Sequence, residues 1–105
     1  MIEIPLSPVS SYFSQPTTLD NKEYELVFQW NFRANRWFFT ISSAGTPVIQ
    51  GLPLVVNYPI LKRYQKILKG LPDGALLLHD TSGKNEEPTR GNLGQTVKLF
   101  YVPRG

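Results

Sequence analysis

Residues 22–32 read KEYELVFQWNF, and apolar side chains alternate with polar ones along nearly the whole segment. A period of two places alternate side chains on one face of a β-strand, whereas a helix would scatter them around its circumference. Aromatic side chains also suit a pleated, half-buried surface. The segment therefore predicts a strand whose apolar face is formed by Tyr24, Leu26, Phe28, Trp30 and Phe32.

Segments on both sides are predicted to pair with this strand. Residues 37–42 read WFFTIS and continue the alternation after a short connection that contains Asn35. Asparagine tolerates the left-handed backbone that hairpin loops often need, so we expect a β-hairpin over Lys22–Ser42. Upstream, Phe13–Leu19 is expected to pair with the same strand through a turn at Asp20-Asn21.

The rest of the chain is divided into short pieces by proline and glycine, which is typical of a sandwich or small barrel. Gly51 and Pro53 interrupt one apolar segment, which predicts an edge strand or a bulge. The last segment carries apolar residues on both faces, which indicates burial on both sides by this domain or by a partner. The further strands are expected over Val48–Val56, Ala75–Asp80 and Gln95–Pro103.

The segment Pro59–Lys69 is ambiguous. Leu61, Tyr64 and Leu68 recur at helical spacing, and Gly70 stands where a helix would end. A short helix fits this pattern, with a strand as the alternative. The predicted fold class is mostly β: a small single-domain antiparallel β-barrel or sandwich over residues 1–105, with that one helix left open.

Composition excludes several function classes. The chain has 105 residues, no cysteine and a formal net charge of +3. Without cysteine there are no disulfides, thiolate nucleophiles or cysteine-based zinc sites. No apolar run approaches the ~20 residues of a membrane helix, and Met1–Pro5 lacks the features of a signal peptide. The basic residues are spread along the chain, which is weak support for a nucleic-acid binder.

Candidate catalytic residues do not form a convincing site. His79, Asp80 and Ser82 are the residue types of a hydrolase triad. Adjacent side chains of a strand point to opposite faces, so Asp80 is not expected to orient His79, and there is no other histidine. No metal-ligand spacing is visible. The sequence thus predicts no enzyme, no catalytic, cofactor-binding or metal-ligating residues, and no cofactor.

A nucleic-acid-binding barrel is the alternative function. Aromatic residues interleaved with basic ones can form a stacking platform for single strands. Such residues surround the hairpin loop: Trp30, Phe32, Arg33, Arg36, Trp37 and Phe38. The alternation instead assigns Trp30, Phe32 and Trp37 to the core. Phe38 points away from them and is expected under another element or at a partner contact.

The polar segment Thr81–Gly94 is long for a connection in a compact domain, and such loops are usually functional or disordered. We expect it to bind a partner, with a mobile surface loop as the alternative. Short side chains at its start can bond nearby backbone groups and anchor its root. Charges of both signs follow, which suits the setting of register at an interface. The predicted partner-interface residues are Phe38, Asp80, Thr81, Ser82, Lys84, Glu86, Glu87 and Arg90.

An ordered set of short motifs runs through almost the whole chain. It comprises Ile2-Glu3-Ile4-Pro5-Leu6, Trp30-Asn31-x-Arg33-Ala34-x-Arg36-Trp37, Gly51-Leu52-Pro53-Leu54-Val55, Leu71-Pro72-x-Gly74-Ala75-Leu76-Leu77-Leu78, Asp80-Thr81-Ser82-Gly83, Pro88-Thr89-Arg90, Leu93-Gly94 and Leu99-x-Tyr101-Val102-Pro103. This set resembles the baseplate plug proteins of contractile-tailed phages of the cyanophage type. Asn57–Lys69 matches the pattern least well.

The resemblance implies a structural component of a phage tail. Such a plug sits near the baseplate axis at the distal end of the tail tube and has no catalytic residues. The implied partners are hub, tube and spike components, with copies of the chain forming a ring or trimer, and no membrane. The implied location is the virion tail, with the host cytoplasm during assembly.

Overall fold

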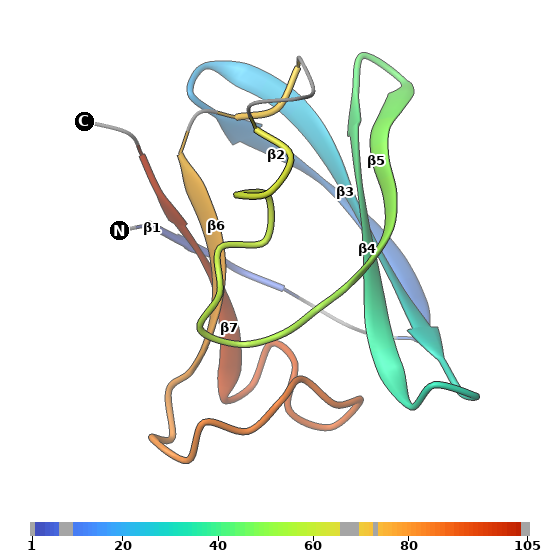
Figure 1. The fold of residues 1–105 in the computed structure, drawn as a ribbon, viewed down its shortest axis with the longest axis vertical. Coiled ribbons are helices and arrows are strands. Elements are labelled where there is room, and N and C mark those ends of the chain that lie inside the picture. The colour runs from blue at the N-terminus through green and yellow to red at the C-terminus, as the bar shows by residue number, and fades with distance from the viewer. Residues whose placement is uncertain (1, 7–9, 66–69, 73, 104–105) are drawn as a thin grey trace.

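The computed structural model describes residues 2–6, 10–65, 70–72 and 74–103. Two antiparallel sheets pack face to face, a smaller one ordered β1-β7-β6 and a larger one ordered β2-β3-β4-β5 (Figure 1). In the described residues the sheets do not close into a barrel, so the sandwich form of the predicted mostly-β fold is confirmed. The strands are β1 (Ile2–Ile4), β2 (Tyr12–Leu19), β3 (Lys22–Asn31), β4 (Arg36–Ser43), β5 (Thr46–Pro53), β6 (Ala75–Asp80) and β7 (Val97–Val102).

The predicted pairing of the first three strands of the larger sheet is confirmed. Strands β2 and β3 are joined by Asp20 and Asn21, whose φ angles of 53° and 64° are those of a two-residue hairpin turn. The next hairpin turns between Asn31 and Arg36, with Asn35 at a φ of 55° as its polar amide allows. These turns fix the register that brings the alternating apolar side chains of β3 onto one face.

The prediction that Phe32 belongs to that face is wrong. Tyr24, Leu26, Phe28 and Trp30 are buried, but Phe32 is 70% exposed. The cause is local, because Asn31 Oδ1 accepts hydrogen bonds from the N–H groups of Arg33 and Ala34, both at 2.9 Å. This side-chain cap starts the turn right after Asn31, which ends β3 before the alternation reaches position 32.

Strand β5 is an edge strand with an irregular register, as its proline and glycine predict. It ends at Pro53 and does not continue to Val56. Pairing with β4 shifts on both sides of Ile41. Gly51 has a φ of 71° and donates its N–H to Thr40 Oγ1 at 3.2 Å, so a side chain replaces a backbone partner at the irregularity.

The smaller sheet contains the predicted strand Ala75–Asp80 as β6 and the centre of the predicted Gln95–Pro103 as β7. The inner face of β7 is buried, whereas Phe100 is half-buried on the outer face and Val102 is 39% exposed. The third strand, β1, is missing from our prediction. It pairs with β7 from Ile2↔Tyr101 to Ile4↔Leu99.

In the segment left open between helix and strand, residues 60–65 form turns, and residues 66–69 lie outside the described residues. No helix occurs in the part of the chain that the structure describes, so none there could span a membrane. Instead the segment lines the edge of β6, where the N–H of Asn57 bonds to the carbonyl of Leu78 and that of Ile60 to Leu76, both at 2.8 Å. Ile60 and Leu61 are consequently buried.

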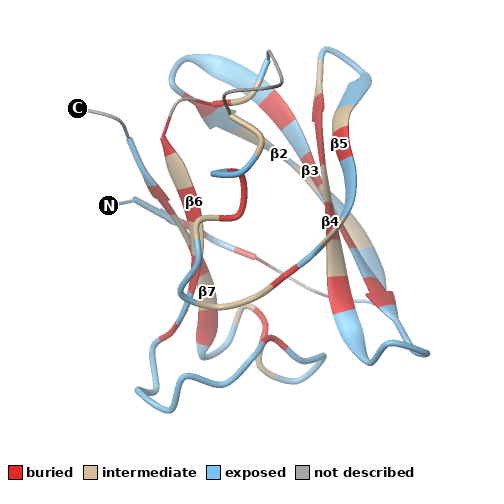
Figure 2. Ribbon diagram, viewed as in Figure 1, coloured by how far each residue is buried: buried red, intermediate tan, exposed pale blue. Residues whose placement is uncertain are grey.

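The core lies between the inner faces of the two sheets, where Figure 2 shows the buried positions. Aromatic rings fill one part of it. Phe13 stacks on Phe28 at 4.8 Å between ring centroids, and Trp37 meets Phe13 and Trp30 edge-on at 5.6 and 5.5 Å. The same buried cluster includes leucines of β6 and β7 from the smaller sheet, among them Leu76, Leu78 and Leu99, which are fully buried.

Candidate partner-binding surface

The long loop after β6 is anchored at its root by Asp80. Its side chain is fully buried, and its two oxygens accept hydrogen bonds from the backbone N–H of Ser82 (2.9 Å), the Ser82 hydroxyl (2.7 Å) and the backbone N–H of Glu86 (2.9 Å). The Ser82 hydroxyl and these two backbone groups lower the pKa of Asp80, with a smaller contribution from His79, against a raising effect of burial. The carboxylate thus fixes the backbone of residues 80–86. This is the anchoring of the loop that its short polar side chains predict.

We predict that Asp80 makes the protein sensitive to acid. Because folding lowers the pKa of Asp80, its stabilising effect is complete above the unfolded value of about 3.9 and is lost as the pH falls through the lower folded value. The Asp80→Asn variant should be less stable at pH 7, since its amide group would oppose the N–H of Glu86. Its deficit should shrink below pH 4. Thermal melts of both proteins from pH 7 to pH 2 check this, and a deficit constant with pH would contradict it.

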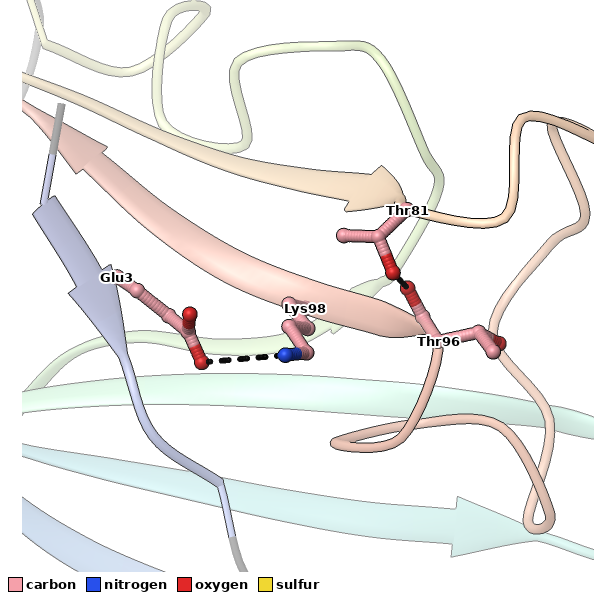
Figure 3. Close-up of polar contacts among 4 residues, drawn as sticks. All are labelled: Glu3, Thr81, Thr96 and Lys98. Carbon is pink, nitrogen blue, oxygen red and sulfur yellow. Dashed lines mark hydrogen bonds and ion pairs between the residues drawn. The ribbon is translucent and has the colours of Figure 1, made fainter.

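A second contact closes the two ends of the loop. Both the backbone N–H and the hydroxyl of Thr81 donate to the carbonyl of Thr96, each at 2.7 Å (Figure 3 draws the hydroxyl bond). Across β7 in the same view, Lys98 Nζ lies 3.8 Å from Glu3 Oε2. Both side chains of this pair are partly exposed, so it contributes little to stability.

The second half of the loop is held to the larger sheet. The indole N–H of Trp37 donates to the carbonyl of Thr89 at 2.9 Å, and the Thr89 N–H donates to Asn92 Oδ1 at 2.6 Å. Asn92 also donates its amide to the Glu87 carbonyl at 3.0 Å. Pro88 and Leu93 are buried on either side of this contact. The loop is therefore folded onto the sandwich at two separated points.

The predicted interface residues lie at four places: the root of the loop, its exposed part, the β3–β4 turn and the outer face of β4. Asp80, Thr81, Ser82 and Glu86 are brought together at the root of the loop. The side chains of Lys84, Glu86 and Glu87 are exposed, and Glu87 lies near the β6 edge, where its Oε1 accepts from the Val56 N–H at 3.5 Å.

Arg90 and Phe38 lie elsewhere. The Arg90 guanidinium carbon lies 5.6 Å from the centroid of the Phe32 ring, at the turn between β3 and β4. Phe38 is half-buried in β4, where it pairs with Gln29 and Pro53. It projects from the face of the larger sheet opposite Trp37 and Phe39, as its position in the alternation predicts.

The triad residues are not assembled for catalysis. Asp80 is buried, whereas His79 is exposed on the opposite face of β6, and His79 Nδ1 lies 3.2 Å from Asn57 Oδ1. The Ser82 hydroxyl donates to Asp80 and not to a histidine. Among the described residues, no group of three or more histidine, aspartate or glutamate side chains could hold a metal ion.

The alternative stacking platform is not formed as a single surface. Trp30 and Trp37 are buried in the core, while Phe32 is exposed at the turn. The side chain that the alternation misplaced is therefore Phe32. The residue that could have indicated its exposure is Asn31, because asparagine commonly starts turns.

A family model described as cyanophage baseplate Pam3 plug gp18 matches residues 1–104. A search of the curated proteins gave no match. The family match covers both sheets and the whole 81–94 loop. The chain belongs to the family of the cyanophage baseplate plug gp18 of Pam3.

Proposed function

We propose that this chain is a structural plug at the distal end of a phage tail tube, where it contacts hub and tube proteins. The family match over residues 1–104 carries this proposal and supports a structural role in the baseplate. The chain acts as one domain and is present as several copies around the tail axis. It is made in the host cytoplasm and built into the virion tail there.

The architecture suits such a role. A plug has to hold its shape while presenting surfaces to several neighbours. Here a continuous core joins both sheets, and the loop is folded onto them at Asp80 and Thr89. Exposed charges of both signs, at Lys84, Glu86 and Glu87, stand on this fixed base. Rigid presentation lowers the entropy lost on binding.

The test is to delete the gene in the phage and compare tails by electron cryomicroscopy with and without complementation. We expect density at the distal end of the tube to disappear on deletion and to return with the wild-type gene. Mass spectrometry of the purified tails provides the composition. Complete, infectious tails that lack the protein would overturn the proposal.

The same role implies that the protein is not an enzyme, and His79 provides the check. We predict that His79→Ala changes the free energy of unfolding by less than about 0.5 kcal/mol, as expected for an exposed side chain, and leaves infectivity unchanged. Denaturant melts and plaque counts measure the two effects. A hydrolytic activity of the wild-type protein that disappears in the folded variant would contradict this prediction.

A further inference from the structure

The turn between β3 and β4 presents an aromatic ring to solvent. At 70%, Phe32 has the highest exposure of the large apolar side chains in the described part of the chain. A ring left in water at the tip of a hairpin adds nothing to the core. Aromatic side chains are, however, enriched among the residues that dominate binding energy at protein interfaces.

Three arginines lie at this end of the molecule, one of them over the ring. Arg33 is exposed on the same turn and Arg36 is exposed where β4 begins, while Arg90 reaches the ring from the loop, with its guanidinium carbon 5.6 Å from the ring centroid. Within the described residues, the one ion pair joins Lys98 and Glu3. No carboxylate among those residues therefore pairs with the three guanidinium groups, which remain free to bind oxygen atoms of a partner.

Hydrogen bonds hold the backbone on both sides of this contact. Asn31 Oδ1 fixes the backbone of Arg33 and Ala34, and the indole of Trp37 binds the Thr89 carbonyl, next to Arg90 in the chain. The backbone that carries the ring and the arginines is thus positioned before any partner arrives. Association then costs less conformational entropy than it would for a mobile loop.

From these observations we infer that Phe32, with Arg33, Arg36 and Arg90, forms an anchor that inserts into an apolar socket rimmed with carboxylates on a neighbouring baseplate protein. This inference rests on the proposed function and names the chemistry of the partner. The ring supplies the buried contact at the centre. The guanidinium groups pair with carboxylates around it, since their planar shape matches two oxygen atoms at once.

A protein partner is favoured over a nucleic acid by the charges beside the tip. The 81–94 loop and the β3–β4 turn lie at the same end of the molecule, the lower end in Figure 1. Glu86 and Glu87 are exposed on that loop. A phosphate backbone laid across this end would meet their carboxylates, whereas a protein surface of mixed charge can match both signs.

The experiment uses purified tails from the gene-deleted phage and measures binding of the added protein by co-sedimentation. We expect wild-type protein to bind, Phe32→Ala to weaken binding about 30-fold, and the double variant Arg33→Glu, Arg36→Glu to weaken it further. The matched controls are Tyr12→Ala, which removes an exposed aromatic ring of β2, and the double variant Lys22→Glu, Lys62→Glu, which reverses two exposed charges away from this turn. They should bind within about 3-fold of wild type, as side chains outside the energetic centre do.

Each other outcome has a defined meaning. Unchanged binding by both tip variants, with wild-type melting curves, would overturn the inference while leaving the proposed function intact. Failure of the wild-type protein to bind would overturn both. A single-stranded DNA oligonucleotide serves as the competing probe. Binding to it that depends on Phe32 and the arginines would replace the protein socket with a nucleic acid.

Discussion

Replacing Trp37 with alanine should destabilise the protein by about 3–5 kcal/mol, the range for removing a large buried aromatic side chain. Trp37 is fully buried, and its ring contacts Phe13 and Trp30 edge-on. The change also leaves the Thr89 carbonyl without its indole donor. A domain of this size has a total stability of about 5–15 kcal/mol, so the loss is a large part of the whole.

Denaturant melts measure the effect, and two variants separate its causes. Trp37→Phe keeps a ring in the core but removes the donor to Thr89, so it should cost less than Trp37→Ala. Phe32→Ala removes an aromatic ring of the exposed turn, two residues beyond Trp30, and should change stability by less than about 0.5 kcal/mol. A loss below about 1 kcal/mol for Trp37→Ala would mean that the packing described between the sheets is wrong.

Gly74→Ala should destabilise the protein by about 3 kcal/mol, the upper part of the usual range for overpacking a core. A β-carbon at this position would lie 2.4 Å from the carbonyl oxygen of Val102 and 2.6 Å from the ring and hydroxyl of Tyr101. The Val102 atom belongs to the backbone of β7, so it cannot move aside as a flexible side chain would. The same glycine donates its N–H to the Tyr101 hydroxyl at 2.9 Å, and that hydroxyl donates in turn to Asp20.

Gly91→Ala is the matched control. Its β-carbon would have one neighbour, the Thr89 hydroxyl at 4.0 Å, and Gly91 is not among the residues with a positive φ. Alanine is expected to be neutral or to stabilise by up to about 1 kcal/mol, because it reduces the freedom of the unfolded chain. Equal melting midpoints for the two variants would show that Gly74 does not lie as close to Val102 and Tyr101 as described here.

The larger sheet was predictable because its signals are local. Alternation along β3 and the turn residues Asp20, Asn21 and Asn35 determine both strand positions and register. The outcome for Phe32 shows the limit of alternation, since one hydrogen-bonding side chain, Asn31, ended the strand early.

The smaller sheet depended on contacts between distant parts of the chain. Strand β1 is only three residues long, which is too short for a recognisable periodicity. Its partner lies almost a hundred positions away in the sequence. Neither a helix nor a strand forms in the described residues of the segment left open, for a related reason. Ile60 and Leu61 are apolar because they pack at the β6 edge, which the spacing of apolar residues within the segment does not reveal.

The candidate site was predictable where its signals are local and not where it depends on distant contacts. Short polar side chains after a buried strand indicated that Asp80 anchors the loop, which its hydrogen bonds bear out. The approach of Arg90 to Phe32 was not predictable, because it depends on how residues 32 and 90 are brought together by separate anchors.

The pairing of the first strand with the last has a mechanical consequence. Because β1 runs antiparallel to β7, Ile2 lies opposite Tyr101, and the free ends of both strands leave the sheet on the same side (Figure 1). Tension applied between these ends would separate the two strands one residue pair at a time. Strands pulled along their length in shear would instead have to break all their pairs together. Under such tension the β1–β7 ladder thus opens in successive steps, and a neighbour that gripped both ends could peel β1 away while the larger sheet stayed folded.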